Sequence, residues 1–222
     1  MFGKNKQMSE SMIMATALAL GGGFRDAYSY NCRGQVFANT QTGNLVLLSQ
    51  SIANKNLDLV LKYILPLFAF FIGVYLTEVI KNACKDFQFI HWRQIIAMME
   101  IVILIIVGFM PTSMNHLANV TISLICAMQV QSFQIFHGVN MATTMCTGNL
   151  KNATELLSSY HFTDDEEKKT KCRYYYFTIL MFCVGAALGA FSSNHLGIKS
   201  IWLDAVIMTF VFILMFKEES KC

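Results

Sequence analysis

The sequence is poor in charged residues. Asp, Glu, Lys and Arg make up 14% of its 222 residues, whereas soluble domains carry roughly 25%. Hydrophobic residues make up 55%. This composition excludes an ordinary soluble domain and indicates a membrane protein. The longest polar connection, residues 158–171, is too short to fold alone. We therefore expect a single integral membrane domain over residues 1–222.

Motifs for metal binding, catalysis and nucleic-acid binding are also absent. The seven cysteines form no Cys-x-x-Cys pair and no Cys/His spacing suited to zinc. There is no His-Glu-x-x-His, no Gly-x-Ser-x-Gly and no phosphate loop. The net charge of +3 comes without a basic patch interleaved with aromatics. We expect no metal, no cofactor, no nucleic-acid partner and no enzymatic activity. The enzymatic alternative is an intramembrane reaction that uses Asp26 with His137.

What is present is a repeated motif, which indicates a duplication, with chance similarity between apolar helices as the alternative. The tripeptide Thr-Gly-Asn occurs at Thr42-Gly43-Asn44 and again at Thr147-Gly148-Asn149, and Leu follows each copy. Each copy follows an apolar stretch that contains small and polar residues. Each precedes a segment with Phe-x-[Ile/Val]-Gly-x-x-Leu, at residues 70–76 and 182–188. The shared order of elements predicts two repeats, at about residues 9–112 and 113–218.

Six apolar stretches are long enough to span a hydrocarbon core, which needs about 17 to 25 residues. They are residues 11–30, 62–80, 94–110, 117–136, 174–192 and 200–216. If the six spans alternate from a cytoplasmic N-terminus, the Lys and Arg residues on the inner side are 4, 6, 81, 85, 93, 168, 169, 171, 173, 217 and 221. The outer side then receives only 33, 55, 62 and 199. This bias places both termini in the cytoplasm. The start also resembles a cleavable signal peptide, but it belongs to the first repeat, so we expect a signal anchor.

The segments that follow the Thr-Gly-Asn copies are not expected to cross the bilayer. The second carries Lys151 and Glu155, and two further crossings would move the basic residues after the second span to the outer side. We expect each to be a short re-entrant or surface-lying half-helix. Three spans and one half-helix per repeat invert the second repeat relative to the first. The predicted fold is an all-α membrane bundle of six transmembrane helices, two half-helices and two inverted repeats, a plan typical of transporters with a site near the midplane.

Thr-Gly-Asn suits the start of such a half-helix. A Thr or Asn side chain can accept hydrogen bonds from the free amides of the first turn, and Gly lets another backbone or a solute come close. The helix N-terminus would then face the solute. We therefore predict that Thr42, Gly43, Asn44, Thr147, Gly148 and Asn149 line a site. The alternative is helix capping and packing without a solute.

The ionisable residues within the spans are further candidates. Gly21-Gly22-Gly23 invites a break in the first span, and Arg25 and Asp26 follow it near the bilayer centre, where a charge is costly and marks a functional hypothesis. Asp26 would carry a proton or bind solute; the alternatives are a structural ion pair and simple exposure at the membrane interface.

The matching positions of the second repeat carry Gln129 and Gln131, which would line the same site, whereas Gln134 and His137 could equally sit at the cytoplasmic interface. Glu100 is a weaker candidate. Asp204, beside Trp202, is expected to reach water.

Three groups of residues resemble the YoaK family of bacterial inner-membrane proteins. They are Gly22-Gly23-Phe24-Arg25-Asp26-Ala27, the segment from Gly34 to Asn44, and Met128-Gln129 with the segment from Thr143 to Asn149. The similarity covers essentially the whole chain and implies an inner-membrane location and, by suggestion only, transport of a small-molecule metabolite.

We therefore predict a transporter of a small polar metabolite in the bacterial inner membrane, with the lipid bilayer, a solute and protons or another coupling ion as partners. The alternatives are a passive channel and a non-transporting membrane scaffold. The charge of the solute stays open, because helix N-termini favour an anion whereas Asp26 favours a cation. Gly185-Ala186-Ala187-Leu188-Gly189 offers a small-residue face that could serve a homo-oligomer or pack within the chain.

Overall fold

A computed structural model describes residues 11–84 and 91–216 of the chain. The two termini and the connection at 85–90 lie outside these ranges. Five basic residues that enter the predicted charge bias, Lys4, Lys6, Lys85, Lys217 and Lys221, therefore lie outside the described residues, as does the start of the expected signal anchor.

The described chain is almost entirely helical, which confirms the all-α class. The long helices are α1 (Met12–Cys32), α3 (Leu57–Ala83), α4 (Trp92–Phe109), α5 (Asn115–Ser132), α7 (Glu166–Leu196) and α8 (Ile201–Phe216), and each covers most of one predicted span. Two further helices, α2 (Gln41–Ala53) and α6 (Cys146–Thr163), begin at the Thr-Gly-Asn copies. Short 3-10 turns occupy Thr112–Met114 and Gly197–Ser200, and a small hairpin pairs β1 (Ile135–Phe136) with β2 (Val139–Asn140).

Apolar helices make this a membrane protein. Among the described residues, three helical segments are long and apolar enough to cross a bilayer: Leu57–Ala83, Trp92–Phe109 and the continuous stretch Glu166–Phe216. Large apolar side chains face outward on them, such as Phe71, Phe109 and Val206, whereas Arg25 and Glu100 are fully buried. Apolar surface outside and charge inside is the arrangement that a hydrocarbon solvent favours.

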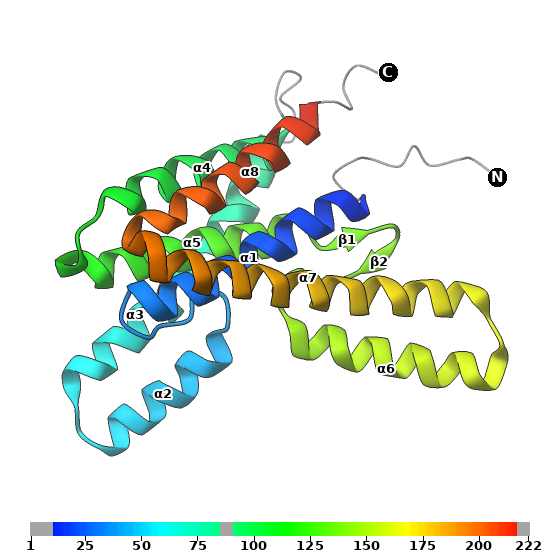
Figure 1. Ribbon diagram of the computed structural model, residues 1–222, viewed down its shortest axis with the longest axis horizontal. Coiled ribbons are helices and arrows are strands. Elements are labelled where there is room, and N and C mark those ends of the chain that lie inside the picture. The colour runs from blue at the N-terminus through cyan, green and yellow to red at the C-terminus, as the bar shows by residue number, and fades with distance from the viewer. Residues whose placement is uncertain (1–10, 85–90, 217–222) are drawn as a thin grey trace.

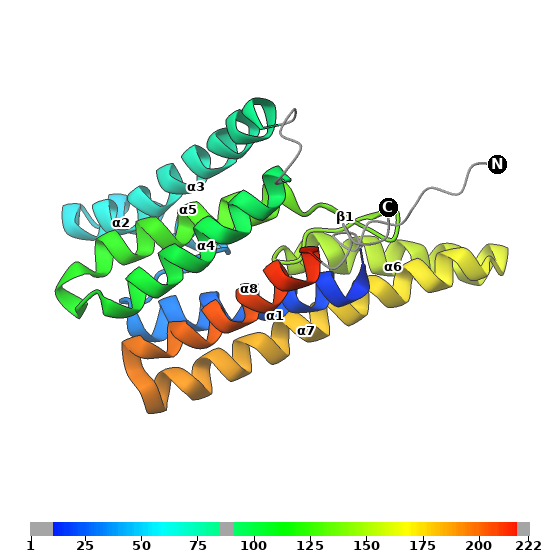
Figure 2. The same cartoon turned by 90° about the horizontal axis from the view of Figure 1, so that it is seen from above.

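The long helices form a row. Neighbours in it are α3 with α5, α5 with α4, α4 with α8, α8 with α1, and α1 with α7, and Figure 2 shows this order from one side of the molecule to the other. The two Thr-Gly-Asn helices pack at the ends of the row, α2 against α3 and α6 against α7. In Figure 1, α2 and α6 leave the middle of the molecule toward opposite ends.

The expected break at the three glycines of α1 is wrong. The helix runs without interruption from Met12 to Cys32. The glycines instead let other groups approach: a Cβ on Gly23 would lie 2.0 Å from the carbonyl oxygen of Phe182, and one on Gly22 would lie 2.4 Å from the Thr144 methyl group. Small residues in a buried helix serve close helix packing here, as they commonly do in membranes.

Gly73 and Gly185 occupy matching places in two helix crossings. A Cβ on Gly73 of α3 would lie 2.4 Å from the Leu124 carbonyl oxygen of α5, and one on Gly185 of α7 would lie 2.1 Å from the Leu20 carbonyl oxygen of α1. Gly189 likewise faces the Phe24 backbone. The small-residue face of α7 therefore packs against α1 within the chain.

The segment between α1 and α2 doubles back along α1. The Ala38 amide donates to Ser29 Oγ at 3.1 Å, and Asn39 Nδ2 donates to the Gly22 carbonyl at 3.0 Å, one residue further along the chain but seven residues earlier on α1. The segment between α5 and α6 also reaches α1, since Thr144 contacts Gly22. Both Thr-Gly-Asn helices thus begin after a segment that has returned to the centre of the bundle.

Substituting either crossing glycine should destabilise the protein. Gly73→Ala and Gly185→Ala each place a methyl group against a backbone carbonyl that cannot move independently, which costs about 1–3 kcal/mol. The matched control is Gly148→Ala in α6, where a Cβ meets nothing within 4 Å and helix propensity gains up to about 1 kcal/mol. Thermal unfolding of the purified protein in detergent measures the difference. Equal midpoints for Gly185→Ala and Gly148→Ala would contradict the packing described.

Candidate functional site

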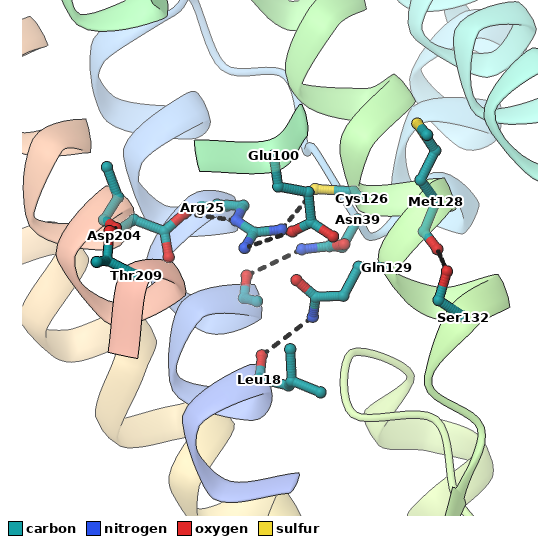
Figure 3. A network of polar contacts seen from close by, with 12 residues as sticks. Leu18, Arg25, Asn39, Glu100, Cys126, Met128, Gln129, Ser132, Asp204 and Thr209 are labelled. Atoms are coloured by element: carbon teal, nitrogen blue, oxygen red, sulfur yellow. Dashed lines mark hydrogen bonds and ion pairs between the residues drawn. The ribbon is translucent and has the colours of Figure 1, made fainter. Parts of the chain in front are cut away.

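A buried ionic cluster occupies the middle of the helix row. Arg25 of α1 donates from Nε to Asp204 Oδ2 of α8 at 2.5 Å, and its Nη2 lies 3.3 Å from Glu100 Oε2 of α4. The side chains of all three residues are fully buried. Figure 3 shows the guanidinium held between the two carboxylates. The carboxylates offset the cost of burying the guanidinium, which would be several kcal/mol for an isolated ion.

The environment of Asp204 differs from the one that the sequence predicted. It was expected to reach water beside Trp202, but it is 0% exposed and bonded to Arg25. The sequence does not reveal that α1 and α4 pack against this face of α8. Glu100, the weaker candidate, lies in the same cluster.

Asp26 has a different set of contacts from its neighbour Arg25. Its Oδ1 accepts from the Asn39 amide and its Oδ2 accepts from Thr40 Oγ1, both at 2.6 Å. Both partners belong to the segment that returns beside α1. Asp26 thus ties this segment to the helix, and both of its oxygens are satisfied.

The two asparagines of the Thr-Gly-Asn copies make equivalent hydrogen bonds to the segment before each helix. Asn44 accepts from the Phe37 amide at 3.1 Å and donates to the Phe37 carbonyl at 2.7 Å. Asn149 donates to the Ala142 carbonyl at 2.6 Å. In each copy the asparagine binds the backbone seven residues earlier, so it holds the returning segment against the first turn of the helix.

The predicted capping role of these motifs is wrong. The N-cap residues are Thr40 for α2 and Met145 for α6, and neither makes a side-chain capping bond. Thr42, Thr147 and Gly148 are exposed, and Gly43 packs beside the Phe37 ring. Only the asparagines of the two motifs are buried.

The two glutamines predicted to line the site, Gln129 and Gln131, lie in different environments. Gln129 is fully buried and its Nε2 donates to the Leu18 carbonyl of α1 at 3.3 Å; Figure 3 shows its carboxamide beside the ionic cluster. Gln131 instead donates to Glu78 at 2.6 Å, where the Glu78 side chain is 41% exposed. Gln134 is exposed and donates to Gln131. The structure therefore brings Gln129 to the centre and leaves Gln131 near the surface.

His137 lies in the turn of the β1–β2 hairpin, with its ring 5.5 Å from that of Tyr174. Positive φ angles at His137 and Gly138 are those of a tight two-residue hairpin turn. The sequence extended the fourth span to residue 136 and did not predict this hairpin, whose two-residue strands are too short to show periodicity.

Arg33 is a buried charge that sequence reasoning assigned to an outer loop. It is 0% exposed, and it donates to Tyr28 Oη at 2.8 Å and to the Val107 and Met110 carbonyls at 2.7 and 2.9 Å. A cation at the C-terminal end of a helix satisfies free carbonyls and the helix dipole. Arg33 thus holds the C-terminal end of α4 against α1.

The cluster retains polar atoms without a hydrogen-bond partner. Among the described residues, buried atoms of this kind in or beside the cluster include Arg25 Nη2, both carboxylate oxygens of Glu100, Asp204 Oδ1, Asn39 Oδ1 and Gln129 Oε1. Native structures leave few such atoms, and each calls for an explanation. Separately, an open pocket of about 460 Å³ is lined by Tyr30, Asn31, Gly34, Gln35, Lys62 and Asn194. None of the predicted site residues lines that pocket.

Removing the asparagine of one motif should loosen the returning segment. Asn44→Ala leaves the Phe37 amide and carbonyl without their partner, which costs about 1–3 kcal/mol for a buried polar group. Thr42→Ala, in the same motif but exposed, is the control and should leave the unfolding midpoint unchanged. Thermal unfolding in detergent gives both values. A loss of stability in Thr42→Ala as large as that in Asn44→Ala would contradict this assignment and show that the threonine also stabilises the segment.

Comparison with known proteins assigns a family to this arrangement. No curated protein and no solved structure matches the chain. Residues 14–214 match the family described as protein of unknown function DUF1275, and the YoaK family, which the sequence resembles, is a DUF1275 family. The match includes every residue of the buried cluster. The chain therefore belongs to the DUF1275 family.

Proposed function

We propose that this protein transports a small polar metabolite across the bacterial inner membrane through a site around Arg25. The observation that carries the proposal is the ionic cluster itself. Arg25 holds one carboxylate from α4 and one from α8, and all three side chains are buried in a bundle of apolar helices. Charges at such depth are costly and mark solute or ion pathways by default.

The proposed transporter has six spans in two inverted repeats, and the order of the helices agrees with this plan. If α1–α4 form one repeat and α5–α8 the other, the row α3–α5–α4–α8–α1–α7 reads the same from both ends. The Gly73–Leu124 and Gly185–Leu20 contacts are then one contact made twice. Transporters built from inverted repeats place their site where the repeats meet, and Arg25 bridges Glu100 of one repeat and Asp204 of the other.

The arrangement of α2 and α6 fits re-entrant half-helices. Each begins after a segment that has returned to α1, and they run toward opposite ends of the molecule. Backbone of this irregular kind is tolerated at membrane depth where protein surrounds it. Here Asp26, Asn44 and Asn149 supply the hydrogen bonds that lipid cannot.

The proposed orientation places both termini in the cytoplasm. Helix α1 begins and α8 ends at the same end of the bundle (Figures 1 and 2). The turn between α6 and α7 lies toward that end, and Lys168, Lys169 and Lys171 follow it. An excess of positive charge belongs on the cytoplasmic side.

Cysteine labelling tests this topology. In a cysteine-free background, Lys55→Cys in the α2–α3 turn should react with a membrane-impermeant maleimide in intact spheroplasts. Asp164→Cys in the α6–α7 turn should react only after permeabilisation. Both positions are in exposed connections outside the ionic cluster, so neither change should disturb folding. Labelling of both from the same side would refute six spans with inverted repeats.

Flux through proteoliposomes tests the transport function. Purified protein should move at least one of ethanolamine, alanine, glycerol and malate faster than protein-free liposomes do. Glu100→Gln and Asp204→Asn should each lower that flux about tenfold or more, because each removes one charge from the site. Glu155→Gln, an exposed change on α6, is the control.

Accumulation against a gradient under an imposed pH difference or membrane potential separates coupled transport from a passive channel. Flux that only ever runs downhill would favour the channel. If none of the four solutes moves, transport of these solute classes is refuted and a membrane scaffold is favoured.

A further inference from the structure

The unpartnered atoms of the buried cluster are nearly all hydrogen-bond acceptors. Glu100, Asp204, Asn39 and Gln129 contribute only oxygens. Among the described residues, Arg25 Nη2 is the one buried side-chain nitrogen without a hydrogen bond, and it faces Glu100 Oε2 at 3.3 Å. A site of this composition needs donors from elsewhere. We infer that its solute carries a primary ammonium group, an inference that rests on the transport function proposed above.

The carboxamide orientations are determined by their partners. Asn39 Nδ2 donates to the Gly22 carbonyl and Gln129 Nε2 donates to the Leu18 carbonyl, and a carbonyl oxygen can only accept. The nitrogens must therefore be at those ends, and the oxygens Asn39 Oδ1 and Gln129 Oε1 must be the free ends. Leu18 and Gly22 lie one turn apart on α1, so the same helix anchors both carboxamides. In Figure 3 both side chains lie beside the Arg25 guanidinium and Glu100.

The charge balance points the same way. Arg25 supplies one positive charge, and its closest bond goes to Asp204 at 2.5 Å. Glu100 receives only the 3.3 Å contact from Nη2, and neither of its oxygens has a hydrogen bond. One guanidinium therefore faces two carboxylates, and an added cation would neutralise the second. An ammonium group has three donors, which can satisfy oxygens of Glu100, Asn39 and Gln129 together.

An anionic solute finds few donors at the first half-helix. Three consecutive backbone amides precede α2, and each already donates to a side chain: Phe37 to Asn44, Ala38 to Ser29 and Asn39 to Asp26. The anion site that a returning segment and a helix N-terminus could form is occupied by the protein's own oxygens. These three amides are therefore not available to an anion, which agrees with a cationic solute.

Binding of three probes of similar size tests the inference in detergent-purified full-length protein. Ethanolamine carries an ammonium group, ethylene glycol is neutral and glycolate is an anion. Ethanolamine should bind and raise the unfolding midpoint, whereas ethylene glycol and glycolate should not. Glu100→Gln should weaken ethanolamine binding about thirtyfold, the equivalent of losing one partner of a buried charge pair. Gln129→Met, which keeps the size but removes the oxygen, should weaken it to a smaller extent.

Glu155→Gln on α6 should bind ethanolamine as the unmodified protein does. Sodium chloride at the same ionic strength is the second control, because an equal midpoint shift with sodium would reveal a general charge effect and overturn the inference. Preferential binding of glycolate, or ethanolamine affinity that survives in both Glu100→Gln and Gln129→Met, would also overturn it.

The binding result separates this inference from the transport function. Ethanolamine binding that depends on Glu100, without flux of any of the four solutes, supports the chemistry of the site and refutes transport of these solute classes. Flux of malate without ethanolamine binding supports transport and refutes the ammonium assignment.

Discussion

The fold depends on a guanidinium that is fully buried among apolar helices. Arg25 lies in the middle of a row of apolar helices, where an unpaired charge would cost several kcal/mol. Glu100 and Asp204 supply the compensation from α4 and α8, so the cluster requires α1, α4 and α8 to meet at one point. Close approach of α7 to the opposite face of α1 then follows from the glycines of both helices. Charge neutralisation and small-residue packing together position α1 as the central helix.

The segments that return to α1 show how irregular backbone is kept inside such a bundle. Each is bound by an asparagine from the helix that follows it, and the first is also bound by Asp26. Side-chain oxygens and amides replace the water that would serve these groups in a soluble loop. This explains why the asparagine is present in both Thr-Gly-Asn copies. The exposed Thr42, Thr147 and Gly148 have no corresponding explanation in the structure.

Much of the architecture was predictable from the sequence, because a membrane helix reveals itself by length and composition. The positions of the six long helices and the start points of α2 and α6 followed from composition and spacing. For the site, the sequence predicted only how deep in the membrane each residue lies. Arg25 and Asp26 are neighbours at the same level, yet one binds α4 and α8 while the other binds the returning segment. Successive residues on a helix point about 100° apart, and direction around the axis has meaning only once the neighbouring helices are known. Asp204 and Arg33 were misplaced for the same reason.

The two hairpins that flank the row differ in charge. The α2–α3 hairpin exposes Leu45, Val46, Ile52 and Leu57, whereas the tip of the α6–α7 hairpin carries Asp164, Asp165, Glu166 and Lys169. If the two halves are the inverted repeats proposed above, the protein could in principle be inserted either way up. The unequal hairpins remove that ambiguity, because the α2–α3 turn carries few charges, Lys55 and Asp58, whereas the α6–α7 tip carries many, and the two differ in their cost of translocation. The difference between the hairpins would then give the molecule a defined inside and outside.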